Sequence, residues 1–211
     1  MKKIKYIAEL CQNHNGKEKN LDEMLDRCVK SGADYVKLQY IFSKNLVFRP
    51  IFETGFSKGK KILSIKRPFK EEFNRLKSIE LKNKVYEKFV TKCEKLGVRP
   101  MITCFSRDNV NTLYNMGYKD IKIASYDCSS FEMIREMSKK FDNIVMSTGA
   151  TYLDEINKSC EILNKSKKNF SLLHCVTIYP TPINKINLKK INFLKNKFKV
   201  PVGFSDHSES F

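Results

Sequence analysis

Hydrophobic and polar positions along the chain follow two alternating patterns. Short runs of β-branched and other apolar residues recur through the sequence, and each is bounded by polar or turn-forming residues. Runs of this length and composition predict buried β-strands. We predict seven strands, at Tyr6–Leu10, Tyr35–Gln39, Pro100–Cys104, Ile121–Ser125, Ile144–Ser147, Ser171–Val176 and Val200–Phe204.

Segments with a helical period lie between most of these runs. Residues 21–29 carry apolar side chains at i, i+3, i+4, i+7 and i+8, and Gly32 follows where a helix would end. Similar stripes occupy residues 89–96, 110–114 and 153–163. Because strands and helices alternate along the chain, the pattern predicts an α/β fold with a parallel sheet and crossover helices.

The number of strands bears on the topology. The segment AELCQNHNG after the first run lacks the GxGxxG turn that a dinucleotide-binding, doubly wound sheet usually carries. A (β/α)8 TIM barrel fits better, but it needs eight strands and about 250 residues. We therefore predict one domain over residues 1–211, a TIM barrel truncated after about seven strands, either as a fragment or truncated product or as a barrel that a partner closes. Because an open barrel exposes a strand edge, we expect this chain alone to be inactive and poorly soluble.

One connection is far longer than a crossover helix requires. About sixty residues separate the second and third predicted strands, and they include the basic stretch FRPIFETGFSKGKKILSIKRPFK. Long connections at the upper face of a barrel often cover the substrate. A basic surface loop without a special role is equally compatible with the sequence.

Charge and cysteine content restrict the possible partners. The formal net charge is +17, but the lysines are spread through almost every predicted helix and loop, which favours a solvated lysine-rich surface over a nucleic-acid interface. Such a surface also attracts small anions. The 7 cysteines are scattered without a CxxC, and the apolar patch before Glu9 is too short for a signal sequence or membrane span. We predict a cytoplasmic protein with reduced thiols and with neither a nucleic-acid nor a membrane partner.

Polar residues follow every predicted strand, where the carboxyl ends of a parallel sheet form the binding face. A single Ser, Thr, Asp or Asn in such a place is more often a helix cap. Two lysines within strands, Lys37 and Lys122, are harder to explain as structure, because lysine is almost never buried unpaired. They predict a bound anion, with Thr103, Ser125 and Ser205 as neutral donors to its oxygens.

Six segments in this order and spacing resemble the sialic acid (N-acetylneuraminate) synthase family, which includes the legionaminate, pseudaminate and spore-coat polysaccharide synthases. The segments are IAELCQNHNG, GADYVKLQ, KIASYDC, STGAT, LLHCVTIYPTP and VGFSDHS. The resemblance implies a TIM barrel that condenses phosphoenolpyruvate with the open-chain aldehyde of an N-acetylated hexosamine, such as N-acetylmannosamine. The expected products are phosphate and a nine-carbon 2-keto sugar acid.

The resemblance also implies roles for individual residues. Glu9 corresponds to the catalytic carboxylate, which orients or deprotonates the attacking water. His207 corresponds to a ligand of a divalent metal, Mn²⁺ or Mg²⁺, and a second histidine is expected on the eighth strand, beyond these residues. His14 and His174 are expected to be structural. The implied substrate contacts are Lys37, Gln39, Thr103, Lys122, Ser125, Asp127, Thr177, Tyr179 and Ser205.

The family further implies a homodimer for the full-length protein, in which a C-terminal domain resembling antifreeze proteins supplies an arginine to the partner's site. The 211 residues include no segment that resembles this domain. Two other functions are compatible with the residues alone. One is a TIM-barrel aldolase that uses Lys37 or Lys122 as a Schiff base, and the other is a polyanion-binding module without catalytic activity.

Overall fold

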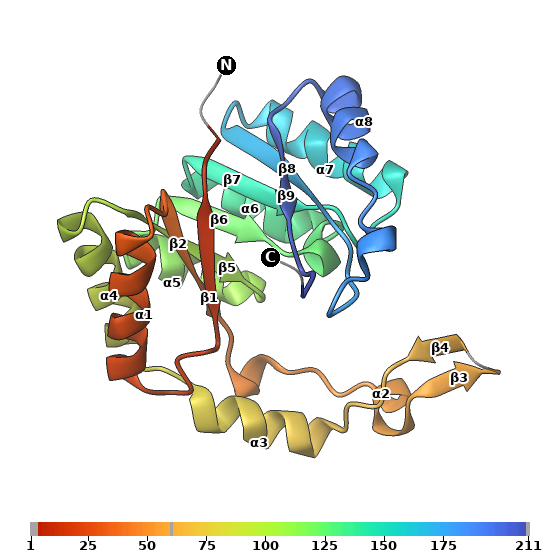
Figure 1. Ribbon diagram of the computed structural model, residues 1–211, viewed down its shortest axis with the longest axis horizontal. Coiled ribbons are helices and arrows are strands. Elements are labelled where there is room, and N and C mark those ends of the chain that lie inside the picture. Colours follow the sequence, from red (N-terminus) through yellow and green to blue (C-terminus); the bar gives the residue numbers. More distant parts are fainter. Residues whose placement is uncertain (1–3, 60, 210–211) are drawn as a thin grey trace.

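The computed structural model describes residues 4–59 and 61–209 and contains one large parallel sheet (Figure 1). Its strands lie in the order β1-β2-β5-β6-β7-β8-β9, so neighbours in the sheet are also successive strands of the sheet along the chain. This order is that of a barrel wound in one direction and not of a doubly wound sheet. The strands are β1 (Ile7–Cys11), β2 (Tyr35–Tyr40), β5 (Arg99–Cys104), β6 (Asp120–Ile123), β7 (Asn143–Ser147), β8 (Asn169–Cys175) and β9 (Val202–Ser205).

All seven predicted strands are present, with shifted ends. Ser125 does not belong to the fourth predicted strand, because it begins the 3-10 helix η3 (Ser125–Asp127). The last strand begins at Val202 and not at Val200. Pro201 precedes this strand and has no N–H to donate to a ladder, although its carbonyl accepts a hydrogen bond from the Leu172 N–H (3.0 Å).

Helices cover the outer face of the sheet (Figure 1). The predicted ones are α1 (Glu18–Lys30), α4 (Asn83–Lys95), α5 (Val110–Asn115) and α7 (Leu153–Lys165). The sequence analysis missed α6 (Phe131–Lys140) and α8 (Lys189–Phe198). The hydrophobic core lies between these helices and the sheet, and each helix except α8 contributes fully buried residues to it. Helix α8 buries only Leu194, so its sequence carries a weak apolar stripe.

The register of the strands divides the side chains between two faces. Val36, Leu38, Ile102, Ile121 and Ile123 belong to the core and point toward the helices. Successive side chains of a strand point to opposite faces. The residues between these positions therefore project from the inner face, which would line the interior of a closed barrel.

The sheet is open within the described residues. There β1 pairs with β2 alone, and β9 pairs with β8 alone. A curved parallel sheet of this order with two edges agrees with the predicted barrel truncated after seven strands. Among the described helices, none has both the length and the apolarity needed to cross a bilayer.

The long connection after β2 folds into an arm that extends away from the sheet (Figure 1). It contains the 3-10 helix η1 (Ser43–Asn45), α2 (Pro50–Thr54) and an antiparallel hairpin of β3 (Phe56–Lys58) and β4 (Lys61–Ser64). Helix α3 (Phe69–Ile79) brings the chain back to the sheet. Many apolar side chains of the arm are exposed, namely those of Val47, Phe48, Ile51, Phe56, Ile62, Leu63 and Ile65. The arm thus carries exposed apolar side chains as well as its basic residues, and in Figure 1 its outer part extends away from the sheet.

Candidate active site

An ionic group occupies the inner face where β1, β2 and β5 adjoin. Glu9 is in register with Lys37, and both side chains project from the same face. The Lys37 side chain is only 4% exposed, forms an ion pair with the Glu9 carboxylate and donates a hydrogen bond to Thr103 Oγ1 (2.9 Å). The Cys11 N–H donates to Glu9 Oε1 (2.8 Å), so both carboxylate oxygens are engaged. The charge of this buried lysine is therefore balanced by the Glu9 carboxylate, and the Thr103 hydroxyl accepts one of its hydrogen bonds.

Lys122 projects toward the same group from β6. It is in register with Thr103, which is in register with Gln39 on β2. Burial and, to a lesser extent, the positive charge of Lys37 lower the pKa of Lys122 to about 8, while the Glu9 carboxylate opposes this shift. Two cations close enough to repel each other favour an anion between them. The sequence analysis expected Lys37 and Lys122 to converge, and the structure brings them together.

The ends of β6, β7 and β8 meet beside Lys122. The Gly149 N–H donates to Ser125 Oγ (3.1 Å), which is also 2.9 Å from Cys175 Sγ. A Cβ atom on Gly149 would lie 2.6 Å from Cys175 Sγ and 3.0 Å from the Thr177 methyl group. This close approach requires glycine. It also places Thr177 at the same rim as Ser125.

The last strand contributes Ser205 and leads to His207. Ser205 is in register with Cys175, so it shares the inner face. His207 Nδ1 lies 3.0 Å from the Val176 carbonyl oxygen, which can only accept, so Nδ1 carries the proton. His207 Nε2 then presents its lone pair toward Ser205 Oγ (3.3 Å) and the Tyr179 hydroxyl (3.4 Å). The Tyr179 and His207 rings pack against each other with centroids 4.3 Å apart and an interplanar angle of 31°.

The lone pair of His207 Nε2 suits a metal, because a backbone carbonyl fixes the tautomer in the manner of many metal-binding histidines. A single imidazole is nevertheless an incomplete donor set for Mn²⁺ or Mg²⁺. Residues 4–59 and 61–209 contain no group of three or more His, Cys, Asp or Glu side chains that could hold a metal ion. The described residues therefore supply one candidate ligand, and we assign no chemical step to a metal.

Asp127 and Gln39 complete the set of predicted residues. Asp127 follows β6 in η3, where burial raises the pKa of its carboxyl group to about 6 and a hydrogen bond from Ser130 Oγ (3.5 Å) opposes the shift. Gln39 accepts a hydrogen bond from Gln12 Nε2 at its Oε1 (3.3 Å). The predicted site residues thus lie either on the strands of the main sheet or in the segments that directly follow them, while their chemical roles remain predictions.

The sequence analysis omitted Ser147 from the site. Ser147 lies two residues after Val145, which is in register with Lys122, so both serine and lysine project from the inner face. The whole residue is 1% exposed, and its hydroxyl has no hydrogen-bond partner among the described residues. A buried hydroxyl without a partner is a candidate donor to a ligand. Its position at the start of STGAT was the available signal.

The two other histidines have structural surroundings, as expected. His14 is buried, and its Nδ1 accepts a hydrogen bond from the Gly16 N–H (3.1 Å) in the loop after β1. His174 faces the helices, where its Nε2 lies 2.7 Å from the Ile186 carbonyl oxygen. Neither belongs to the inner-face group.

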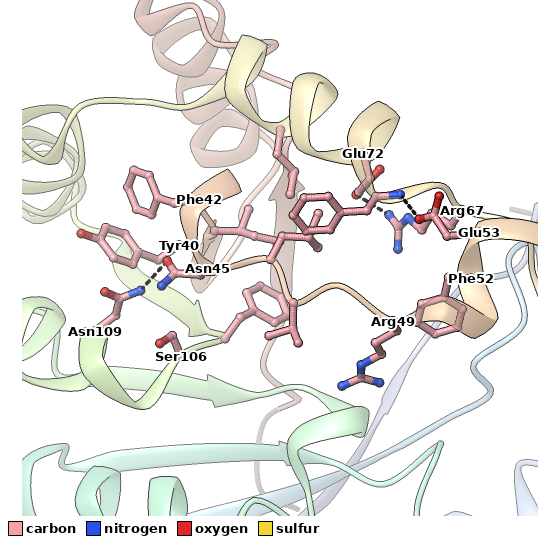
Figure 2. Close-up of a pocket in the computed structure, with 16 residues that line it drawn as sticks. Tyr40, Phe42, Asn45, Arg49, Phe52, Glu53, Arg67, Glu72, Ser106 and Asn109 are labelled. Carbon is pink, nitrogen blue, oxygen red and sulfur yellow. Dashed lines mark hydrogen bonds and ion pairs between the residues drawn. The ribbon is translucent and has the colours of Figure 1, made fainter.

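A cavity of about 280 Å³ lies outside this group, between the arm, α3 and the ends of β2 and β5 (Figure 2). Aromatic rings of Tyr40, Phe42, Phe52, Phe69 and Phe105 line much of it. Figure 2 also shows an ion pair in its wall, between Arg67 Nη2 and Glu72 Oε1 (2.7 Å). The lining includes none of the predicted site residues, so this hollow is a neighbour of the candidate site and not part of it.

Comparison with curated proteins gives relatives along almost the whole chain. The N,N'-diacetyllegionaminic acid synthase of Campylobacter jejuni is 32% identical over 211 residues, which are 99% of this chain and 62% of that protein. The pseudaminic acid synthase of the same species is 32% identical over 212 aligned positions, covering 100% of this chain and 60% of that protein. The chain thus spans about 60% of the length of these relatives.

Solved structures agree with the sequence relatives. The N-acetylneuraminic acid synthetase of Leptospira borgpetersenii, solved with citrate, superposes with a TM-score of 0.84 at 28% identity, covering 97% of this chain and 65% of that one. A truncated 3-deoxy-D-arabino-heptulosonate 7-phosphate synthase of Thermotoga maritima gives 0.66 at 13% identity, a likeness of fold alone. The model of the NeuB family matches residues 24–211. The chain therefore belongs to the NeuB family, as the resemblance of its motifs to the sialic acid synthases indicated.

Proposed function

We propose that the chain is the barrel part of an enzyme that condenses phosphoenolpyruvate with an N-acetylated hexosamine. N-Acetylmannosamine or a related amino sugar would supply the aldehyde, and the product would be a nine-carbon 2-keto sugar acid. The observation that carries the proposal is the convergence of Lys37 and Lys122 on the inner face beside Glu9. Family membership supports it, because relatives named as legionaminic and pseudaminic acid synthases cover nearly the whole chain.

The inner-face group suits a small substrate with two anionic ends. Lys37 and Lys122 would bind the phosphate and carboxylate oxygens of phosphoenolpyruvate, because charge-assisted hydrogen bonds are the strongest a site can offer an anion. The hydroxyls of Thr103, Ser125 and Ser205 would donate to the remaining oxygens. An anion between the lysines would also stabilise the protonated form of Lys122, whose pKa is lowered to about 8.

The chemistry follows from the reactivity of an enol phosphate. The C3 carbon of phosphoenolpyruvate would form a bond to the aldehyde carbon of the sugar, and a cationic oxocarbenium centre would develop at C2. The electron pair of the aldehyde π bond would pass to the aldehyde oxygen, which takes up a proton from solvent and becomes a hydroxyl group. Water adds to C2 and loses a proton, for which Glu9 would be the acceptor. Cleavage of the C2–O bond then releases phosphate and leaves the 2-keto acid. The ion pair with Lys37 would hold the Glu9 carboxylate in place for this role.

The proposal extends to the surroundings of the reaction. His207 Nε2 would be one ligand of a divalent metal, and Gln39, Asp127, Thr177 and Tyr179 would contact the sugar. The full-length enzyme would act in the cytoplasm as a homodimer. These assignments rest on the family resemblance together with the positions of the residues at one rim.

Ligand binding and product analysis test the proposal. Phosphoenolpyruvate should bind the full-length protein in isothermal titration calorimetry, and Lys37→Met should weaken binding roughly 100-fold, about 3 kcal/mol for a charge-assisted contact. Lys139→Met removes an exposed lysine of α6 and should leave binding unchanged. Mass spectrometry of a reaction with Mn²⁺ and N-acetylmannosamine in the full-length protein should show a product that contains the carbons of both substrates. Equal binding by both variants would overturn the proposed site.

A Schiff-base aldolase is the second candidate, because a lysine with a lowered pKa beside another cation is the usual nucleophile of such enzymes. Lys122 has this environment. Borohydride reduction with a carbonyl substrate should leave a covalent adduct on Lys122 if the aldolase assignment is right. The condensing enzyme should give no adduct.

A further inference from the structure

A chain of hydrogen bonds connects α3 with the inner-face rim. Arg75 of α3 is held by Glu72 through two contacts, Nε to Oε2 (2.9 Å) and Nη2 to Oε1 (2.8 Å). Its third nitrogen, Nη1, donates to Gln12 Oε1 (3.0 Å), and Gln12 Nε2 donates to Gln39 Oε1 (3.3 Å). Residues far apart in the sequence are thereby joined from α3 through the β1–α1 loop to β2. We refer to Arg75, Gln12 and Gln39 as the amide relay.

The direction of the amide relay is fixed by its first member. A guanidinium group has donors only, so the atom of Gln12 that faces Arg75 must be the carbonyl oxygen. The amide nitrogen of Gln12 must then face Gln39, and the atom of Gln39 that receives its hydrogen must be the oxygen. One donor-only side chain therefore sets the orientation of two amides whose oxygen and nitrogen would otherwise be interchangeable.

Arg75 is itself firmly placed. The Glu72 side chain is 10% exposed and also pairs with Arg67 (2.7 Å). Hydrogen bonding from Arg75 and the charge of Arg67 hold the pKa of Glu72 below its ordinary value, so the carboxylate stays ionised near neutral pH. A bidentate contact with a carboxylate restricts a guanidinium more than a single hydrogen bond does. The end of the relay nearest α3 is thus anchored.

The free end of the relay is the amide nitrogen of Gln39. Gln39 is in register with Thr103, and Thr103 with Lys122, so its side chain shares their face. Its Oε1 accepts the hydrogen bond from Gln12, and its Nε2 has no hydrogen-bond partner among the described residues. The nitrogen is a donor only, since an amide NH₂ cannot accept.

We propose that Arg75 and Gln12 are positioning residues that present the Gln39 amide as a hydrogen-bond donor to the sugar substrate. The group recognised would be an acceptor oxygen, such as the carbonyl of an acetamido substituent or a sugar hydroxyl acting as acceptor. This inference rests on the proposed condensing function. It predicts that this position of the sugar site selects hydrogen-bond acceptors, because an ammonium or other donor-only substituent there would face another donor and be rejected.

Gln12→Glu is the decisive variant, because a carboxylate only accepts. Glu at position 12 would keep the contact with Arg75 but would accept a hydrogen bond from Gln39, which would turn the Gln39 oxygen toward the substrate. We expect N-acetylmannosamine affinity, measured with phosphoenolpyruvate present, to fall about tenfold, which corresponds to about 1.4 kcal/mol. Phosphoenolpyruvate affinity and the melting temperature should stay unchanged. Asn192→Asp introduces the same charge at an exposed site on α8 and should alter neither affinity.

A second measurement reports the amide itself. In ¹⁵N-labelled protein without substrate, Gln12→Glu should move one side-chain amide proton of Gln39 downfield, because it becomes bonded to a carboxylate. Unchanged Gln39 resonances would overturn the inference even if the sugar bound weakly, and so would equal sugar affinity of Gln12→Glu and the unmodified protein. Failure of the unmodified protein to bind the sugar would instead remove the proposed function, and the inference with it.

Discussion

The two faces of the main sheet are made from alternating residues of the same strands, yet their chemistry differs. On β2, Val36 and Leu38 are completely buried against the helices, while Lys37 and Gln39, which alternate with them, face inward. On β6, Ile121 and Ile123 flank Lys122 in the same way. The outer face gains stability from apolar burial. The inner face holds cations whose burial is unfavourable without a partner.

This difference shows where folding and ligand binding are separated in the molecule. A substitution on the outer face should act on the free energy of unfolding, and one on the inner face should act mainly on anion affinity. Neighbouring residues of one strand belong to opposite faces, because the side-chain period of a strand is two. The separation can therefore be tested with neighbouring residues of a single strand.

The largest effect is expected from Ile121→Ala on the outer face. The side chain is 0% exposed, so its truncation leaves a cavity and should lower the free energy of unfolding by about 3 kcal/mol. Urea denaturation measures this loss. Ile183→Ala is the matched control, since Ile183 is 66% exposed and its loss should change stability by less than about 0.5 kcal/mol. Equal losses in the two variants would contradict the distinction between the faces.

An intermediate effect is expected from pH on the inner face. The proposed site binds the anion through the protonated form of Lys122, whose pKa is about 8. The dissociation constant of phosphoenolpyruvate should therefore rise tenfold per pH unit above that value, about 1.4 kcal/mol each. Calorimetry between pH 6.5 and 10 measures this slope. Lys122→Arg should remove it, because a guanidinium remains protonated throughout. A flat profile for the lysine protein would exclude Lys122 as the titrating cation.

The same lowered pKa of Lys122 also affects folding stability, and here a rise in pH is favourable, whereas it weakens anion binding. The folded protein disfavours the charged form, so Lys122 is destabilising below about pH 8, where it is protonated in both the folded and unfolded states. Its contribution to the free energy of unfolding becomes more favourable as pH rises from about 8 toward the ordinary value of 10.5. Alkaline conditions thus weaken anion binding while they relieve the folding penalty of this lysine.

The smallest effect is expected from Ser147→Ala. Its buried hydroxyl has no partner among the described residues, so its removal should raise the free energy of unfolding by about 1 kcal/mol. Phosphoenolpyruvate affinity should fall about fivefold, because a donor to the anion is lost. Ser138→Ala is the control, since Ser138 Oγ donates to the Arg135 carbonyl (2.9 Å) and its loss should destabilise. Destabilisation by both variants would show that the Ser147 hydroxyl serves the fold.

The sequence predicted the strands and most of the helices that bury apolar side chains in a regular pattern. All seven strands of the main sheet were found, because their apolar runs are bounded by clear turn signals. Helix α8 was missed because it buries only Leu194. Helix α6 was missed although it buries Met133, Ile134 and Met137, so its apolar stripe was an overlooked signal. The hairpin of β3 and β4 was missed because the described side chains of β3 are all exposed, which leaves no alternation to detect. Periodicity reports burial, and segments that bury little give no signal.

The site could be predicted as far as residue type and strand position carry information. Lys37 and Lys122 were identified because a lysine within an apolar strand is unusual. The contact between Arg75 and Gln12, which are 63 residues apart, depends on how α3 returns to the sheet. The unpartnered state of the Ser147 hydroxyl likewise depends on its neighbours from other strands. Such features belong to the three-dimensional structure and have no local sequence signature.

The open sheet places the two halves of the candidate site at opposite margins. Glu9 lies on β1 and Ser205 on β9, and each of these strands has a single neighbour among the described residues. A small anion that contacts residues of both edge strands would connect β1 with β9 and restrain both strands against local unfolding. Substrate should therefore slow amide hydrogen exchange most strongly in β1 and β9, and least in the central strand β6.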